Sequence, residues 1–187
     1  MAPLLRSEFL ASRVAQQNFA ATLLGLPASK LRAAYECPDC GSGPHIVHGR
    51  PGYLLDGGPA PLVLSASRAS GWVLFAAVVH PEPGLRLGAD LESAAGTEFA
   101  GFDGVALTPR ERRHLDALDA GHRALERARL WARKEAWLKM AGVGLRVDPN
   151  SLDVLERPGL WDVELPASAD GQDLPAGLAG AVALTAP

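Results

Sequence analysis

The sequence GADLE at residues 88–92 is the stretch around which the expected fold and chemistry are organised. Asp90 and Glu92 stand two positions apart at the end of an apolar run that predicts a β-strand. Because side chains alternate between the two faces of a strand, both carboxylates are expected to point the same way. Taken alone, the two acids would also suit ordinary polar residues at a strand end.

A second stretch, WARKEAWLK at residues 131–139, predicts a helix that carries the complementary groups. Glu135 and Lys139 are four positions apart, which places them on one helical face. Alone, they would equally suit a surface ion pair. Three carboxylates that converge beside a lysine, however, suit Mg²⁺, which takes oxygen ligands and commonly keeps substrate phosphates in its coordination shell. The two stretches together therefore predict a magnesium and phosphate site.

Length and composition set the class of protein. The chain has 187 residues, 48% of them hydrophobic and 21% charged, which predicts a soluble globular protein built as one compact unit or two small halves. No apolar run is long enough for a membrane span, and the first residues lack the pattern of a secretory signal. Two cysteines make no disulfide framework, so the expected location is the cytoplasm.

The charge is distributed unevenly along the chain. Residues 108–146 hold ten Lys and Arg against five acids, a balance of +5, whereas the whole chain carries −3. Such a segment is either a solvated helix face or a surface that attracts an acidic partner or a polyphosphate. Nucleic acid is not expected as a partner, because the chain is acidic overall and has no stripe of basic and aromatic residues.

Hydrophobic periodicity and turn residues predict an α+β fold. Thr108, Pro109 and Glu111 form a strong helix start, with a cap, a proline at the first helical position and a capping-box glutamate. We expect strand 85–92 to pair with strand 72–80 through the turn at 81–84. The further predictions are helices at 7–24, 108–118 and 122–141, strands at 62–65, 151–155, 161–165 and 180–185, and irregular segments at 36–61 and 93–107.

Three blocks in this order resemble the 4′-phosphopantetheinyl transferase superfamily. They are SASRASG at 65–71, GADLE at 88–92 and WARKEAWLKMAGVGL at 131–145. The third is similar to the signature W-x-x-K-E-x-x-x-K-x-x-G-x-G-L at every fixed position. CPDCG at 37–41, followed by HGRP at 48–51, also resembles the segment before the first motif in actinobacterial members.

The resemblance also implies a subtype. The 89 residues before Asp90 leave room for another half-domain, as in the surfactin-synthetase-activating type. That similarity implies a pseudo-twofold pair of small α+β subdomains, with an N-terminal half at 1–84 and a C-terminal half at 85–187. It further implies a cytoplasmic monomer with coenzyme A bound between the halves.

The activity that the resemblance implies is that of a holo-[acyl-carrier-protein] synthase. Such an enzyme transfers 4′-phosphopantetheine from coenzyme A to a serine of an apo acyl or peptidyl carrier protein in polyketide or nonribosomal peptide biosynthesis, and releases 3′,5′-ADP. The implied roles are Mg²⁺ binding by Asp90, Glu92 and Glu135, general-base catalysis by Glu135, a phosphate contact by Lys139, and coenzyme A contacts by Arg50 and Pro51. Lys134 would either orient the site or contact phosphate.

Two departures from the family pattern leave a rival interpretation open. Arg68 stands where the first motif usually has a phosphate-binding histidine, and arginine retains the capacity to bind phosphate. The N-terminal segment that usually contacts the 3′-phosphate is short here, with Arg6 or Arg13 as candidate substitutes. The rival is a degenerate homologue that binds coenzyme A or a carrier protein without catalysis.

The only two cysteines raise a separate possibility. Cys37 and Cys40, with His45 and His48, offer four potential zinc ligands at compressed spacing. A zinc-stabilised interaction domain without enzymatic activity is therefore a further hypothesis. The alternative is an ordinary loop with two free thiols.

Overall fold

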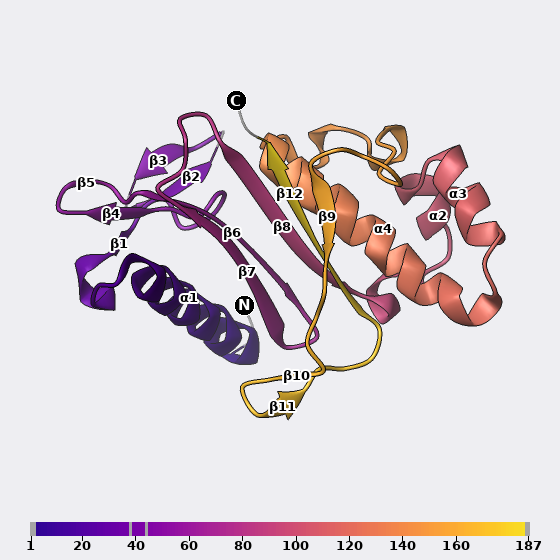
Figure 1. Ribbon diagram of the computed structural model, residues 1–187, viewed down its shortest axis with the longest axis horizontal. Coiled ribbons are helices and arrows are strands. Elements are labelled where there is room, and N and C mark those ends of the chain that lie inside the picture. Colours follow the sequence, from indigo (N-terminus) through magenta and orange to yellow (C-terminus); the bar gives the residue numbers. More distant parts are fainter. Residues whose placement is uncertain (1–2, 38, 44, 186–187) are drawn as a thin grey trace.

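Strand β8 (Arg86–Ser93), which carries the GADLE stretch, lies at the centre of the molecule (Figure 1). The structure is a computed structural model that describes residues 3–37, 39–43 and 45–185. Residues 87–91 are all buried, because β12 (Leu178–Thr185) pairs antiparallel with the whole of β8 and helix α4 (Ala120–Ala141) packs against both strands. β9 (Leu160–Val163) pairs with the other edge of β12 and completes a sheet of order β8-β12-β9.

Helix α4 approaches β8 very closely at Gly88. A Cβ atom at this position would lie 2.0 Å from the carbonyl oxygen of Ala136 and 2.5 Å from the backbone nitrogen of Met140. Ala132 and Ala136 are fully buried on the helix, so small side chains line its contact with the sheet. The glycine of the GADLE stretch is therefore required by packing between the two elements that carry the carboxylates.

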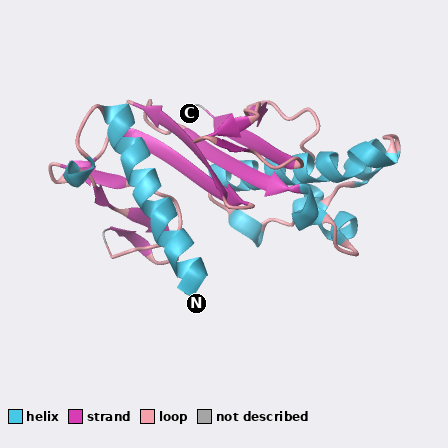
Figure 2. Cartoon of the chain, turned by 90° about the horizontal axis from the view of Figure 1, so that it is seen from below, coloured by secondary structure: helices cyan, strands magenta, loops and turns pink. Residues whose placement is uncertain are grey.

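The first part of the chain forms a second helix-on-strand unit. Strands β6 (Leu62–Ala69) and β7 (Trp72–Val79) make an antiparallel hairpin, and α1 (Pro3–Leu24) packs on β7. The rings of Phe19 and Phe75 stack there with centroids 5.3 Å apart. Figures 1 and 2 show α1 and α4 over different parts of the strand layer. Short strands β1 (Arg32–Ala33), β4 (Tyr53–Leu55) and β5 (Gly58–Pro59) form one small sheet, and β2 (Tyr35–Cys37) and β3 (Gly41–Gly43) form another.

Two serines of β6 join the hairpin to β8, which lies beside it without a shared backbone ladder. The amide of Ala89 donates a hydrogen bond to Ser65 Oγ at 2.8 Å. Ser67 Oγ donates to Asp90 Oδ1 at 2.6 Å. These two side-chain hydrogen bonds therefore fix the position of the β6–β7 hairpin relative to β8, next to the carboxylates.

Most of the remaining elements lie beside α4 and the C-terminal strands, whereas η1 packs against α1. The capping box of Thr108 and Glu111 starts α3 as predicted. These elements are α2 (Phe102–Ala106), α3 (Pro109–Asp116), the short 3-10 helices η1 (Ala28–Lys30), η2 (Ala94–Thr97), η3 (Gly144–Arg146) and η4 (Pro149–Ser151), and the hairpin β10 (Ser168–Ala169) with β11 (Gln172–Asp173). Among the described residues, no helix combines the length and apolar character that a membrane span requires.

The α+β class is confirmed, and three details of the sequence interpretation are wrong. Strand 85–92 does not pair with strand 72–80, because β6 is the ladder partner of β7 and β12 is that of β8. Residues 151–155 form no strand, because Ser151 ends η4 and the residues after it are irregular. The segment 36–61 contains short strands, and the segment 93–107 contains short helices. These elements are too short to produce a recognisable hydrophobic periodicity in the sequence. The division into halves at residue 84 stays a prediction.

Candidate active site

Four of the predicted site residues come together where α4 crosses β8. Asp90 is 2% exposed, and its Oδ1 accepts hydrogen bonds from Lys139 Nζ at 2.6 Å and from Ser67 Oγ at 2.6 Å. Its Oδ2 is buried and has no hydrogen-bond partner among the described residues. Glu92, two residues along β8, and Glu135, one helical turn before Lys139, are half-buried beside it.

The proximity of three acids changes their proton affinities. Burial, followed by the charges of Asp90 and Glu135, raises the pKa of Glu92 to about 7. Burial and the charge of Asp90 raise the pKa of Glu135. Burial also raises the pKa of Asp90, although Lys139 and Ser67 oppose this. The three carboxylates are thus close enough to repel one another. Lys139 contacts Asp90 directly, and its charge opposes the rise in the pKa of Glu92 and of Glu135.

Trp131 adds a contact that sequence reasoning missed. Its side chain hydrogen-bonds Glu92, while its ring packs edge-to-face on Phe102 with centroids 5.6 Å apart. This tryptophan stands one turn before Glu135 on α4, and that spacing is the signal that could have placed it on the same face.

The donor set fits a hard divalent cation such as Mg²⁺. All three groups offer carboxylate oxygens, which this class of ion prefers. Asp90 Oδ2 is an acceptor removed from water with no donor to satisfy it, a situation that costs free energy unless a cation or donor occupies the space. Burial and then repulsion between the carboxylates raise the pKa values of Glu92 and Glu135, and a divalent ion would relieve the repulsion.

A cleft of about 770 Å³ opens beside Lys139, between α1, β6 and the C-terminal end of α4. Its floor is apolar, with Leu64, Phe75 and Leu138. Six cationic side chains line it against two acids, Glu36 and Asp39. The cations are Arg13, Arg50, Arg68, Arg86, Lys139 and Arg146. An elongated anionic ligand with apolar parts suits such a cleft.

The cleft includes three of the residues expected to contact coenzyme A. Arg50 donates to the carbonyl of Met140 at 3.4 Å, at the end of α4, and Pro51 lines the wall beside it. Arg68 donates to Ser12 Oγ at 3.3 Å, and its guanidinium lies over the ring of Phe9 at 5.7 Å.

Arg13, one of the two candidate substitutes in the N-terminal segment, also lines the cleft. Its guanidinium lies 4.0 Å from the ring centroid of Tyr35, and it donates to the carbonyl of Val47 at 2.9 Å. The other candidate, the side chain of Arg6, lies outside the described part of the chain.

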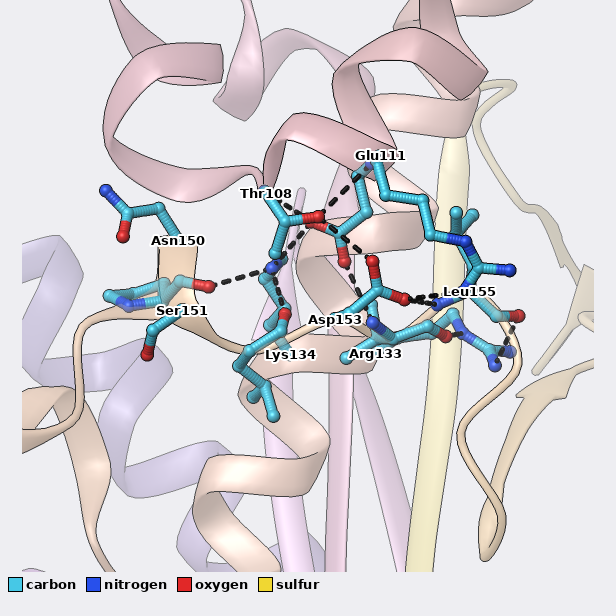
Figure 3. A network of polar contacts seen from close by, with 12 residues as sticks. Thr108, Glu111, Arg133, Lys134, Asn150, Ser151, Asp153 and Leu155 are labelled. Carbon is cyan, nitrogen blue, oxygen red and sulfur yellow. Dashed lines mark hydrogen bonds and ion pairs between the residues drawn. The ribbon is translucent and has the colours of Figure 1, made fainter.

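Lys134 does not lie at the cleft, which corrects the expected phosphate contact. Its side chain is fully buried and pairs with the equally buried Glu111 at 2.7 Å (Figure 3). Its ammonium also donates to the carbonyl of Pro149 at 2.8 Å and to that of Leu152. Glu111 in turn accepts from the amides of Thr108 at 2.8 Å and Val154 at 2.9 Å. The lysine therefore ties α3, α4 and the 149–154 segment together.

The basic segment 108–146 is mostly neutralised by local partners. The acids come from outside the segment or from the same helix, so the segment's sequence charge overstates its surface charge. The pairs are Arg110 with Asp153 and Glu156, Arg127 with Asp103, Arg129 with Glu126 and Asp162, and Arg133 with Asp162. Lys139 and Arg146 of this segment lie in the cleft, where Arg13, Arg50, Arg68 and Arg86 from other parts of the described chain join them.

Comparison with known proteins agrees with this geometry. Residues 86–160 match the model of the 4′-phosphopantetheinyl transferase superfamily, a stretch that begins at β8 and includes Asp90, Glu92, Glu135 and Lys139. The matched stretch covers less than half of the chain, and over that stretch the chain is similar to the superfamily. No curated protein matches the chain.

Proposed function

We propose that this protein is an Mg²⁺-dependent transferase that moves 4′-phosphopantetheine from coenzyme A to a serine of an apo acyl or peptidyl carrier protein. The observation that carries the proposal is the junction of two features: three buried or half-buried carboxylates and a cleft lined by six cations, with Lys139 common to both. The superfamily match over residues 86–160 supports the same reaction.

The chain's own residues would share the work of binding and proton transfer. The arginines of the cleft bind the phosphates of coenzyme A, and its apolar floor accommodates the pantetheine arm. Lys139 holds the pyrophosphate beside Asp90 as a compact positive charge. Asp90, Glu92 and Glu135 would hold Mg²⁺, which when bound neutralises charge on the pyrophosphate.

In the reaction, the serine oxygen of the carrier forms a bond to the phosphorus that bears pantetheine. The phosphoanhydride bond breaks, and its electron pair leaves with 3′,5′-ADP. Glu135 accepts the serine proton, directly or through water, because it is a half-buried carboxylate one helical turn from Lys139, beside the place where the pyrophosphate would bind.

We further infer that the chain works as a monomer of the two-subdomain, surfactin-activating type. The support is the presence of two helix-on-strand units, α1 on β7 and α4 on β8 and β12, with the cleft lined by residues of both.

Mass spectrometry of apo carrier proteins provides the test. A panel of carriers incubated with the protein, coenzyme A and Mg²⁺ should gain the mass of phosphopantetheine. Asp90→Asn should abolish the gain, since it removes a ligand charge while preserving side-chain size. Asp162→Asn serves as control, because that acid pairs with Arg129 and Arg133 away from the cleft. An inactive wild type that still binds coenzyme A would instead establish the non-catalytic alternative.

A further inference from the structure

Cys37, Cys40 and His48 form a second cluster of ligand atoms, separate from the carboxylates. The two sulfur atoms and an imidazole nitrogen all lie within 4.8 Å of one another. Both thiols are free. Cys37 is buried, whereas Cys40 and His48 are exposed, so the cluster lies at the surface and is open to solvent.

The backbone brings these three residues together. Cys37 ends β2 opposite Gly41 of β3, so that a tight turn returns Cys40 to the same place. The segment that carries His48 lies beside β2, because Glu36 of β2 and Arg50 exchange backbone hydrogen bonds at 2.9 and 2.7 Å. Gly49 makes this approach possible, because a Cβ atom there would lie 2.2 Å from the carbonyl oxygen of Glu36.

The surrounding core is too small to stabilise this region well. Tyr35, Cys37 and Ile46 form a separate cluster of buried residues, detached from the two larger cores. Small units with little buried apolar surface commonly depend on a metal or a disulfide. Two thiolates and an imidazole are ligands that suit zinc better than the hard cation of the carboxylate site.

We propose that Cys37, Cys40 and His48 bind Zn²⁺, with solvent as the fourth ligand. The ion would cross-link the β2–β3 hairpin to the strand-like segment that follows His48. That segment continues into Arg50 and Pro51, which line the cleft, and Asp39 of the hairpin turn pairs with Arg146 at 3.3 Å. Zinc would therefore hold one wall of the cleft in place and have no part in the chemical step.

Metal analysis of the full-length protein tests this proposal. Protein purified under reducing conditions with added zinc should retain about one equivalent per chain after desalting. Cys40→Ser and His48→Gln should lose it, and both positions are exposed, so the fold should tolerate the substitutions. Replacement of zinc by Co²⁺ should produce thiolate-to-cobalt absorption in the wild type that is absent from Cys40→Ser.

Two histidine controls make the result specific. His45→Gln in the same loop and His122→Gln at the start of α4 should both retain zinc, because neither ring belongs to the cluster. Retention of zinc by His48→Gln, or a wild type that binds neither zinc nor cobalt, would overturn the proposal. So would a Cys37–Cys40 disulfide in the wild type isolated with reductant. These readouts do not use transferase activity, so they remain informative if the proposed reaction is wrong.

Discussion

Glu92 shows how the site shapes the behaviour of a single residue. Its carboxylate is half-buried, hydrogen-bonded by Trp131 and close to the charges of Asp90 and Glu135. The environment raises its pKa from 4.5 to about 7. The folded protein therefore holds this proton more tightly than the unfolded chain does, and ionisation of Glu92 opposes folding.

We predict a pH-dependent gain in stability for Glu92→Gln in metal-free protein. Below pH 4.5 Glu92 is protonated in both states and contributes no such penalty; the penalty develops as pH rises and is complete above about pH 7. The variant should exceed the wild type in Tm above pH 7, and the difference should vanish below pH 4.5. Scanning calorimetry in the presence of a chelator measures this difference in Tm. Addition of Mg²⁺ should raise the Tm of the wild type above pH 7. An equal difference at both pH values would refute the explanation.

The contact between α4 and β8 shows how two elements assemble the site. Asp90 and Glu92 lie on the strand, and Glu135 and Lys139 lie on the helix. Their separation depends on the closeness allowed by Gly88 opposite the backbone of Ala136 and Met140. A displacement of the helix would separate the lysine from Asp90, which it now contacts at 2.6 Å.

Gly88→Ala should therefore damage both stability and activity. Overpacking at such a contact costs roughly 1–3 kcal/mol, and the loss of transfer should exceed what the unfolded fraction explains. Denaturant unfolding and the carrier assay on the same sample measure the two effects. Gly104→Ala in α2 is the matched control, because a Cβ atom there meets nothing within 4 Å. Normal stability in Gly88→Ala would contradict the packing argument.

The buried pair of Lys134 and Glu111 stabilises the junction of α3, α4 and the 149–154 segment. Both side chains are fully buried, and burial lowers the pKa of Lys134. Removal of one partner would leave an uncompensated charge inside the protein.

Lys134→Met should lower the free energy of unfolding by roughly 3–5 kcal/mol. A second change, Glu111→Gln, should recover part of this loss because it removes the stranded charge. At a temperature where Lys134→Met remains folded, its affinity for coenzyme A should equal that of the wild type. Weaker coenzyme A binding by the folded variant would revive the phosphate contact that the structure does not support.

At the scale of the whole molecule, the net charge of the chain is negative, whereas the charge of the residues that line the cleft is positive. The chain carries −3, yet its cleft presents six cations and two acids. The arginines of α3 and α4 outside the cleft are largely paired with acids, as in Arg110 with Asp153 and Glu156. Attraction for an anionic substrate should therefore come from the cleft, to which α4 contributes Lys139, and not from the paired arginines of α3 and α4.

Coenzyme A binding should follow this distribution. Arg68→Ala should weaken binding by about tenfold or more, because a hydrogen bond to a charged group contributes roughly 1.5–3 kcal/mol. Arg68→His should recover much of the affinity, and Arg110→Gln should leave it unchanged. Added salt should weaken wild-type binding through screening of these charges. Titration calorimetry measures the affinity of each variant for coenzyme A. Equal affinities for the wild type and Arg68→Ala would exclude Arg68 as a phosphate contact.

Local chemistry was readable in the amino-acid sequence. The capping residues Thr108 and Glu111 predicted the start of α3, and the two-residue spacing of Asp90 and Glu92 predicted a shared strand face. These features depend on neighbours a few residues away, for which the geometry of helices and strands is nearly constant. The α+β class followed from the same local patterns, and the positions of the carboxylates and Lys139 followed from motifs confined to single elements.

Long-range contacts determined the rest. β8 pairs with β12 and not with β7, the strand that precedes it in the sequence. Strand pairing depends on which faces of both strands are buried, and the turn at residues 81–84 does not reveal this. Lys134 is turned away from the cleft by Glu111 and by carbonyls of a later segment. Arg13 and Arg86, from α1 and β8, meet in one cleft, and Cys40 meets His48, only after the chain has folded.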